Sequence, residues 1–147
     1  MEHLALNGGV KIRKKPFPKH PIIGDEEKRQ VLEVLESGNI STFIASPGEN
    51  FLGGKKIREF ENKFAKKIGT TYGVAFNSAT SALHAAVVAV GVLPGEEVIV
   101  PPYTFTSTAT CALMHNAIPV FCDVKKDTYC LDPAKLESVT SKLSKAV

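Results

Sequence analysis

Hydrophobic residues spaced three and four positions apart mark the helices of this chain. The clearest set is Ile57, Phe60, Phe64 and Ile68, with lysine and glutamate between them and Gly69 after the last one. This spacing predicts an amphipathic helix over 57–68, because residues three and four apart share one helix face. Similar signals predict a helix between the capping residue Asp25 and the stop Gly38, and another whose apolar stripe covers Leu83–Val90 and which Gly91 ends. Further helices are predicted at about 106–115 and after the cap-then-proline pair Asp132-Pro133.

Three short apolar runs alternate with these helices and predict strands. They cover Tyr72–Phe76, Val98–Val100 and Ala117–Cys122. Strands that alternate with helices favour a parallel sheet covered on both faces, so the expected fold class is α/β. Pro119 is unusual inside a strand, because proline lacks the N–H that a sheet uses.

The first 24 residues show neither a helical nor a strand period. They contain glycines, prolines and the basic cluster Lys11, Arg13, Lys14 and Lys15. This composition predicts an extended arm, 1–24, whose basic side chains are solvated or contact a second subunit; a contact with phosphate is the alternative. Residues 39–54 are expected to form a long loop, and the domain is expected to cover 25–147.

Composition adds restrictions on the class of protein. The 147 residues are 44% hydrophobic and 22% charged, with a formal net charge of +3, which favours an ordinary folded domain without a nucleic-acid or membrane partner. No apolar run approaches the roughly 20 residues of a membrane span. Cys111, Cys122 and Cys130 form no CxxC pair, which favours reduced thiols over a disulfide or zinc site. We expect a soluble, cytoplasmic protein.

The segment Asn77-Ser78-Ala79-Thr80-Ser81 is the first candidate for chemistry. It lies between a predicted strand and a predicted helix, where parallel sheets bind ligands. Its small residues allow close approach of a ligand, the helix N-terminus presents unpaired N–H groups, and the Thr80 and Ser81 hydroxyls add donors, so a phosphate fits there. Simple N-capping by Ser78 or Thr80 is an equal alternative. Neither a GxGxxG nor a GxxxxGK[ST] motif is present, which disfavours a nucleotide-binding domain.

A second candidate follows the strand Val98–Val100. Pro101 and Pro102 end the strand and lead the chain out of the sheet, which places Tyr103 or Phe105 near the strand ends. An aromatic face beside a phosphate site suits a flat, phosphorylated ring. Packing of these rings in the core is the structural alternative.

Five short motifs in a fixed order carry a resemblance to a known family. They are Gly54-x-x-Ile57-x-x-Phe60-Glu61, Ala79-Thr80-Ser81-Ala82-Leu83, Pro94-Gly95-Glu96-Glu97-Val98-Ile99-Val100-Pro101, Thr104-Phe105 and Pro119-Val120-Phe121-x-Asp123. The set resembles the DegT/StrS family of PLP-dependent aminotransferases of fold type I. Residues 4–9 and 16–18 look most like the branch that aminates keto-sugars and keto-cyclitols, and the match extends from about Leu4 to Val147.

The resemblance implies a fold and a cofactor site. The chain would be an arm and helices followed by part of the mostly parallel-sheet large domain of a fold-type-I transferase. Ser78, Ala79 and Thr80 would bind the phosphate of pyridoxal 5′-phosphate (PLP), and Phe105 would stack on its pyridine ring. The pair Asn77-Ser78 departs from the commonest form of this turn, in which Asn directly precedes the Gly-Thr pair. Asp123 matches a recurrent Asp and is expected to be structural.

The resemblance also implies what lies outside these residues. The Lys that forms the Schiff base with PLP, and the Asp that pairs with the pyridinium nitrogen, have no matching position in residues 1–147. Family chains are more than twice this length, so we expect an N-terminal piece that is marginally stable and inactive alone. Family members are dimers with active sites at the subunit interface, which implies a homodimer.

The function implied is transfer of an amino group from Glu or Gln to a keto-sugar or keto-cyclitol. Two alternatives remain open. One is a PLP-dependent sugar dehydratase of the same family, commonly with His at the lysine position. The other is a non-catalytic truncated remnant that binds PLP weakly.

Overall fold

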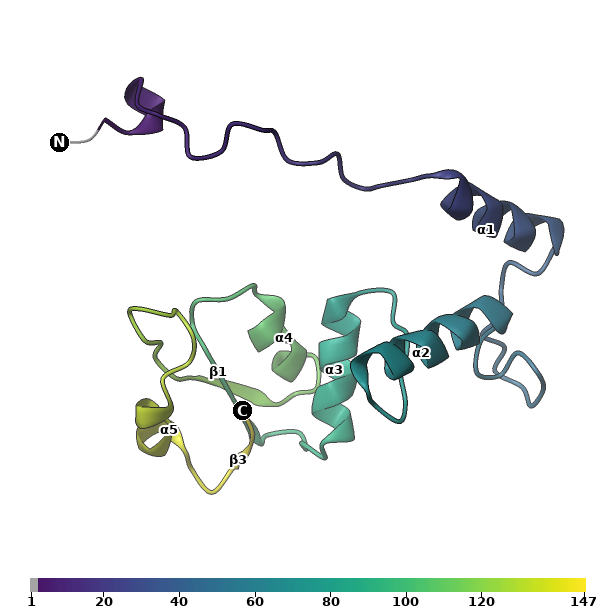
Figure 1. The fold of residues 1–147 in the computed structure, drawn as a ribbon. Helices are drawn as coiled ribbons and strands as arrows, with labels where there is room; N and C mark the ends of the chain where they lie inside the picture. The colour runs from purple at the N-terminus through teal and green to yellow at the C-terminus, as the bar shows by residue number, and fades with distance from the viewer. Residues whose placement is uncertain (1–2) are drawn as a thin grey trace. The chain divides into compact units, whose positions relative to one another are not determined.

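The computed structural model describes residues 3–147 (Figure 1). The chain divides into two compact units, residues 1–54 and 55–147, and each is described by itself. The elements in chain order are the 3₁₀ turn η1 (Ala5–Asn7), α1 (Asp25–Glu36), α2 (Lys55–Ile68), α3 (Ala79–Ala89), β1 (Glu97–Val100), α4 (Ser107–Leu113), β2 (Ile118–Phe121), α5 (Pro133–Val139) and β3 (Ser144–Ala146). Every expected helix is present.

The first unit contains the arm, α1 and the 39–54 loop. The described part of the arm is irregular apart from the single turn η1. Helix α1 begins one residue earlier than expected: Gly24 is the N-cap, and its N–H donates to the Glu27 carboxylate at 2.7 Å. The expectation that Asp25 caps the helix is therefore wrong. The Asp25 carboxylate instead pairs with Lys28 at 3.0 Å, because Gly24 has the extended backbone of a cap and Asp25 is already helical.

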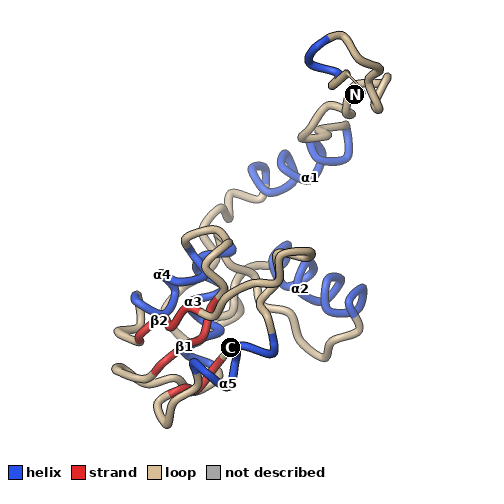
Figure 2. The backbone as a smooth tube through the Cα atoms, turned by 90° about the vertical axis from the view of Figure 1, so that its left-hand side faces the viewer, coloured by secondary structure: helices blue, strands red, loops and turns tan. Residues whose placement is uncertain are grey.

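The second unit is built on a three-stranded parallel sheet, with strand order β2-β1-β3 (Figure 2). Glu97 to Val100 of β1 pair in register with Ile118 to Phe121 of β2. Pro119 thus lies in β2, opposite Val98, and it is tolerated because β2 is an edge strand of this sheet. The parallel sheet and the α/β fold class are as expected.

One expected strand is wrong. Residues 72–76 have no regular secondary structure and pair with no strand among residues 3–147. The third strand is instead β3, which the sequence did not reveal because Ser144-Lys145-Ala146 is not an apolar run. The start of β1 holds it in place: the Glu97 N–H donates to the carbonyl of Leu143 at 2.9 Å, and the Glu97 carboxylate accepts from the hydroxyls of Ser141 and Ser144.

The hydrophobic core surrounds β1. Val98 and Val100 of β1 belong to one cluster of buried residues. Its other members are Val87 of α3, Cys111 and Ala112 of α4, and the loop residues Val92 and Ala117. Ile99 alternates to the other face of the strand and is only 1% exposed. Strand β1 is therefore buried on both sides, as expected for the centre of a parallel α/β sheet.

The three cysteines are all unpaired. Cys111 and Cys122 are small buried residues, whereas Cys130 is exposed. Across residues 3–147, no helix has both the length and the apolar character needed to cross a membrane.

Candidate functional site

The two candidate segments lie at the same end of the second unit. Helix α3 and strand β1 run in opposite directions and are joined by a short turn, so the start of α3 and the end of β1 are at one edge (Figure 1). Helix α4 packs against α3, β1 and β2. The turn before α3 and the segment between β1 and α4 therefore lie at the same end of the unit, the carboxyl end of β1, where parallel α/β folds bind ligands.

Ser78 is the N-cap of α3. Its Oγ accepts a hydrogen bond from the N–H of Ser81 at 3.1 Å. The Ser81 hydroxyl donates to Oδ1 of Asn77 at 2.9 Å and lies 3.0 Å from the Ser78 hydroxyl. Because a hydroxyl has one hydrogen, the Ser81 hydroxyl is occupied within the turn rather than directed outward. Of the two capping alternatives, Ser78 and not Thr80 fills the position.

The cap leaves donors available at the start of α3. The N–H groups of Ala79 and Thr80 have no hydrogen-bond partner within residues 3–147, because the first N–H groups of a helix have no carbonyl one turn before them. The next two are satisfied: the Ser78 hydroxyl accepts the N–H of Ser81, and the Ser78 carbonyl accepts that of Ala82. Ala79 is exposed and Thr80 is half-buried. The helix is eleven residues long, so its dipole adds a positive field at these amides.

Phe105 lies between β1 and α4 with its ring exposed. Its carbonyl accepts the N–H of Thr108 at 3.1 Å, which ties its backbone to the first turn of α4, and the side chain is 75% exposed. Tyr103 differs, because its ring packs against that of Tyr129, with centroids 5.5 Å apart. Neither ring is in the core of the described residues. Among the described residues, Phe105 stacks on no other aromatic ring, so its ring is accessible to a ligand.

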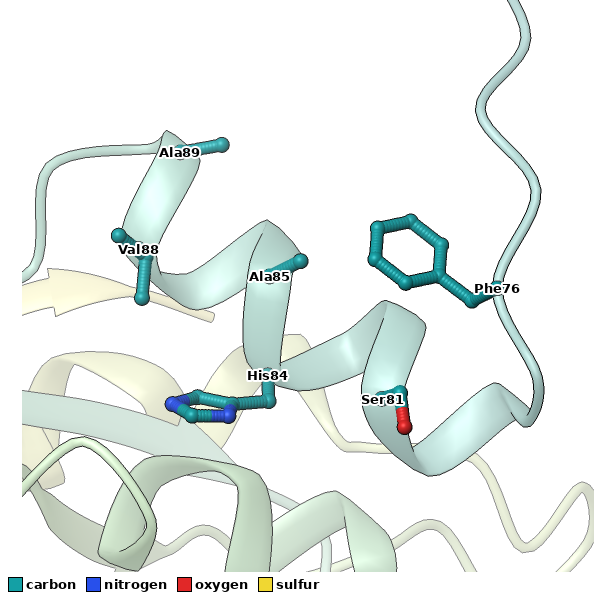
Figure 3. A pocket seen from close by; sticks show the side chains of 6 residues that line it. All are labelled: Phe76, Ser81, His84, Ala85, Val88 and Ala89. Atoms are coloured by element: carbon teal, nitrogen blue, oxygen red, sulfur yellow. The ribbon is translucent and has the colours of Figure 1, made fainter. Parts of the chain in front are cut away.

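A hollow of about 450 Å³ lies along α3 (Figure 3). Phe76 turns its ring toward the helix, and the rest of the lining comes from α3: Ser81, His84, Ala85, Val88 and Ala89. The lining contains no Lys or Arg. This hollow therefore offers no lysine or arginine side chain to an anion.

One contact near the site could not be read from the sequence. Glu61 of α2 accepts a hydrogen bond from the N–H of Ala75 through Oε1, at 2.7 Å. Glu61 occurs in one of the five motifs, but its partner is a backbone group fourteen residues later, and a backbone group carries no side-chain signal. Elsewhere in the described part of the chain, no cluster of His, Cys, Asp and Glu is arranged to hold a metal ion.

Asp123 has the structural position expected of it. Its Oδ1 accepts the N–H of Val124 at 2.8 Å, and its carbonyl accepts the N–H of Asp132 at 2.9 Å. Asp132 is in turn the N-cap of α5. Asp123 thus links the end of β2 to the start of α5.

Comparison with known proteins extends these observations. Residues 21–147 match the DegT/DnrJ/EryC1/StrS aminotransferase family. The chain is 42% identical over 127 residues to the spore coat polysaccharide biosynthesis protein SpsC of Bacillus subtilis, covering 86% of this chain and 30% of that protein. It is 38% identical over 144 residues to an L-glutamine:2-deoxy-scyllo-inosose aminotransferase of Streptomyces paromomycinus, covering 98% of this chain and 33% of that protein.

A solved structure agrees with the fold. The PLP form of the putative sugar aminotransferase Spr1654 from Streptococcus pneumoniae superposes with a TM-score of 0.73 at 32% sequence identity, covering 84% of this chain and 29% of that one. The present chain thus spans about a third of the length of the proteins it matches.

Proposed function

The chain belongs to the DegT/DnrJ/EryC1/StrS aminotransferase family, and from this membership we propose that the protein is a PLP-dependent aminotransferase that transfers an amino group from L-glutamine or L-glutamate to a keto-sugar or keto-cyclitol. The name of the Streptomyces relative supports glutamine as donor and a keto-cyclitol as acceptor. The PLP form of Spr1654 supports the cofactor.

The observation that carries the proposal is the pair of unpaired N–H groups at the start of α3. A phosphate ester needs N–H donors, a positive local field and room to approach, and Ala79 and Thr80 supply all three. The side chain of Ala79 is a single methyl group, so the backbone is accessible. The residues present therefore fit the phosphate of PLP.

Each residue of the turn has a separate task in this proposal. Ala79 and Thr80 donate their backbone N–H groups to the phosphate, and the Thr80 hydroxyl adds a third donor. Ser78 holds the first turn of α3 in shape through its bond to Ser81. Phe105 would stack on the pyridine ring of PLP and help to align it. PLP, when bound, supplies an electron sink for the bonds at the amino-bearing carbon.

The residues assigned here bind and orient the cofactor. None of them is proposed as the Schiff-base lysine or as a catalytic acid or base. A homodimer is part of the proposal, because the family resemblance implies an active site shared between two subunits.

The test uses the complete polypeptide encoded by the gene, loaded with PLP. We expect L-glutamine to convert the bound cofactor to pyridoxamine 5′-phosphate (PMP), followed by its absorbance, and 2-deoxy-scyllo-inosose or a keto-sugar to restore PLP with formation of an amino product detected by mass spectrometry. Consumption of a sugar without an amino product would identify a dehydratase instead. Absence of any change with amino donors would contradict the proposal.

A further inference from the structure

We propose that Glu61 is a positioning residue for the cofactor phosphate: it holds residues 73–75 against α2 and thereby sets the place of the turn from which Ala79 and Thr80 donate. This inference rests on the proposed function. It adds a residue that lies outside the turn and acts only through the backbone.

The first contact is the hydrogen bond from the Ala75 N–H to Oε1 of Glu61, at 2.7 Å. Both residues are half-buried. A carboxylate acceptor makes this bond stronger than one between neutral groups. Ala75 lies two residues before Asn77, which accepts from Ser81 at the base of α3, so the bond anchors the chain directly before the turn.

The second contact involves Gly73. A Cβ atom built on Gly73 would lie 2.8 Å from the carbonyl oxygen of Glu61 and 3.6 Å from Cβ of Ala65. The backbone at position 73 thus runs so close to α2 that a side chain there would collide with the helix backbone. Gly73 and Ala75 therefore contact the same turn of α2.

These contacts matter because residues 72–76 pair with no strand within residues 3–147. Within the described residues, the contacts with Glu61 therefore tie this segment to α2. Loss of the Glu61 carboxylate would leave the half-buried Ala75 N–H unsatisfied and would free the segment to shift. The N–H groups of Ala79 and Thr80 would then no longer be held at the spacing that a phosphate requires.

The experiment compares two ligands that differ only in the phosphate group. PMP and pyridoxamine are titrated by calorimetry against the complete polypeptide encoded by the gene; neither carries an aldehyde, so neither forms a Schiff base with lysine. The variants are Glu61→Ala, Glu61→Gln, which keeps an oxygen acceptor, and Gly73→Ala, which disturbs the same contact from the other side. Glu59→Ala is the matched control on the same helix, because the Glu59 carboxylate bonds to exposed Lys63 at 2.6 Å.

For Glu61→Ala we expect the affinity for PMP to fall about tenfold and that for pyridoxamine to stay within about twofold. Glu61→Gln should restore most of the PMP affinity, Gly73→Ala should lower it in the same selective way, and Glu59→Ala should leave both affinities unchanged. An equal loss for both ligands, or no loss, in Glu61→Ala and Gly73→Ala would overturn the inference. Failure of the unmodified protein to prefer PMP over pyridoxamine would instead overturn the phosphate site itself.

Discussion

Phe105 shows how a single residue's environment separates a role in binding from a role in folding. Its backbone is tied to α4 by the bond from Thr108, yet three quarters of its side chain is exposed. A ring that buries little area in its own chain contributes little hydrophobic free energy to folding. Its exposure at the same end of the unit as the start of α3 is therefore consistent with a ligand contact.

Replacing Phe105 with Ala should weaken PLP binding by ~1 kcal/mol, because stacking of aromatic rings contributes about that much beyond area burial. The free energy of unfolding should change by no more than about 0.5 kcal/mol, as for other exposed positions. Spectroscopic titration with PLP and urea denaturation measure the two quantities.

Tyr103→Ala is the matched control, because Tyr103 lies in the same segment but packs against Tyr129. We expect the control to leave PLP affinity unchanged. Equal losses of affinity in both variants would argue against a stacking role for Phe105.

At the scale of elements, the start of α3 depends on its cap. Ser78 accepts the N–H of Ser81, and the resulting first turn leaves the next two amides free for a ligand. The same side chain is therefore expected to stabilise the helix and to shape the proposed phosphate site.

Ser78→Ala should lower the free energy of unfolding by ~1 kcal/mol, as expected for loss of an N-cap acceptor. Affinity for PLP should fall as well, because the first turn of α3 becomes less ordered. Ser138→Ala in α5 is the control, since the Ser138 hydroxyl donates only to the carbonyl of Lys135 within its own helix. Urea denaturation of both variants measures the difference; similar unfolding free energies for the two would rule out a capping role of this size.

At the scale of the whole molecule, the hydrophobic core of the described residues belongs to the second unit. The buried hydrophobic residues run from Ala65 to Cys122, and none lies in residues 3–54. Large apolar side chains of the first unit are exposed, including Leu6 at 94%. Stability of the chain is therefore expected to depend on the packing around β1.

Ile99→Ala should lower the free energy of unfolding by about 2–5 kcal/mol, because Ile99 is 1% exposed and its truncation leaves a cavity on one face of β1. Leu6→Ala should change it by less than about 0.5 kcal/mol. Both variants are compared by urea denaturation of the 147-residue chain. A destabilisation by Leu6→Ala as large as that by Ile99→Ala would show that a second core exists.

Much of the fold was predictable because the signals are local. The helix over 57–68 follows from four apolar residues at helical spacing, and the structure has α2 at Lys55–Ile68. The pair Asp132-Pro133 predicts the start of α5, and Asp132 caps it by accepting the N–H of Ala134 at 3.1 Å. Helix periodicity and capping depend on residues within one turn of each other, so they are visible without tertiary structure.

The candidate site was predictable to the same extent. The small residues of the turn place it at a helix N-terminus, and α3 indeed begins at Ala79 with Ser78 as its cap. The ordered motifs predicted the family to which the chain belongs. The roles of Ser78, Ala79, Thr80 and Phe105 in binding PLP stay predictions. Which hydroxyl caps α3 was not predictable, because Ser78 and Thr80 are chemically equivalent as caps.

The sequence by itself predicted the helices, the family, and the strands at 98–100 and 117–122, which the structure has at Glu97–Val100 and Ile118–Phe121. Only the tertiary structure decided that residues 72–76 are not a strand, that Ser144–Ala146 is one, and that Glu61 accepts the Ala75 N–H just before the start of α3. The physical reason is common to all three. A strand exists only where another strand pairs with it, and a carboxylate finds a backbone N–H only where two distant segments meet.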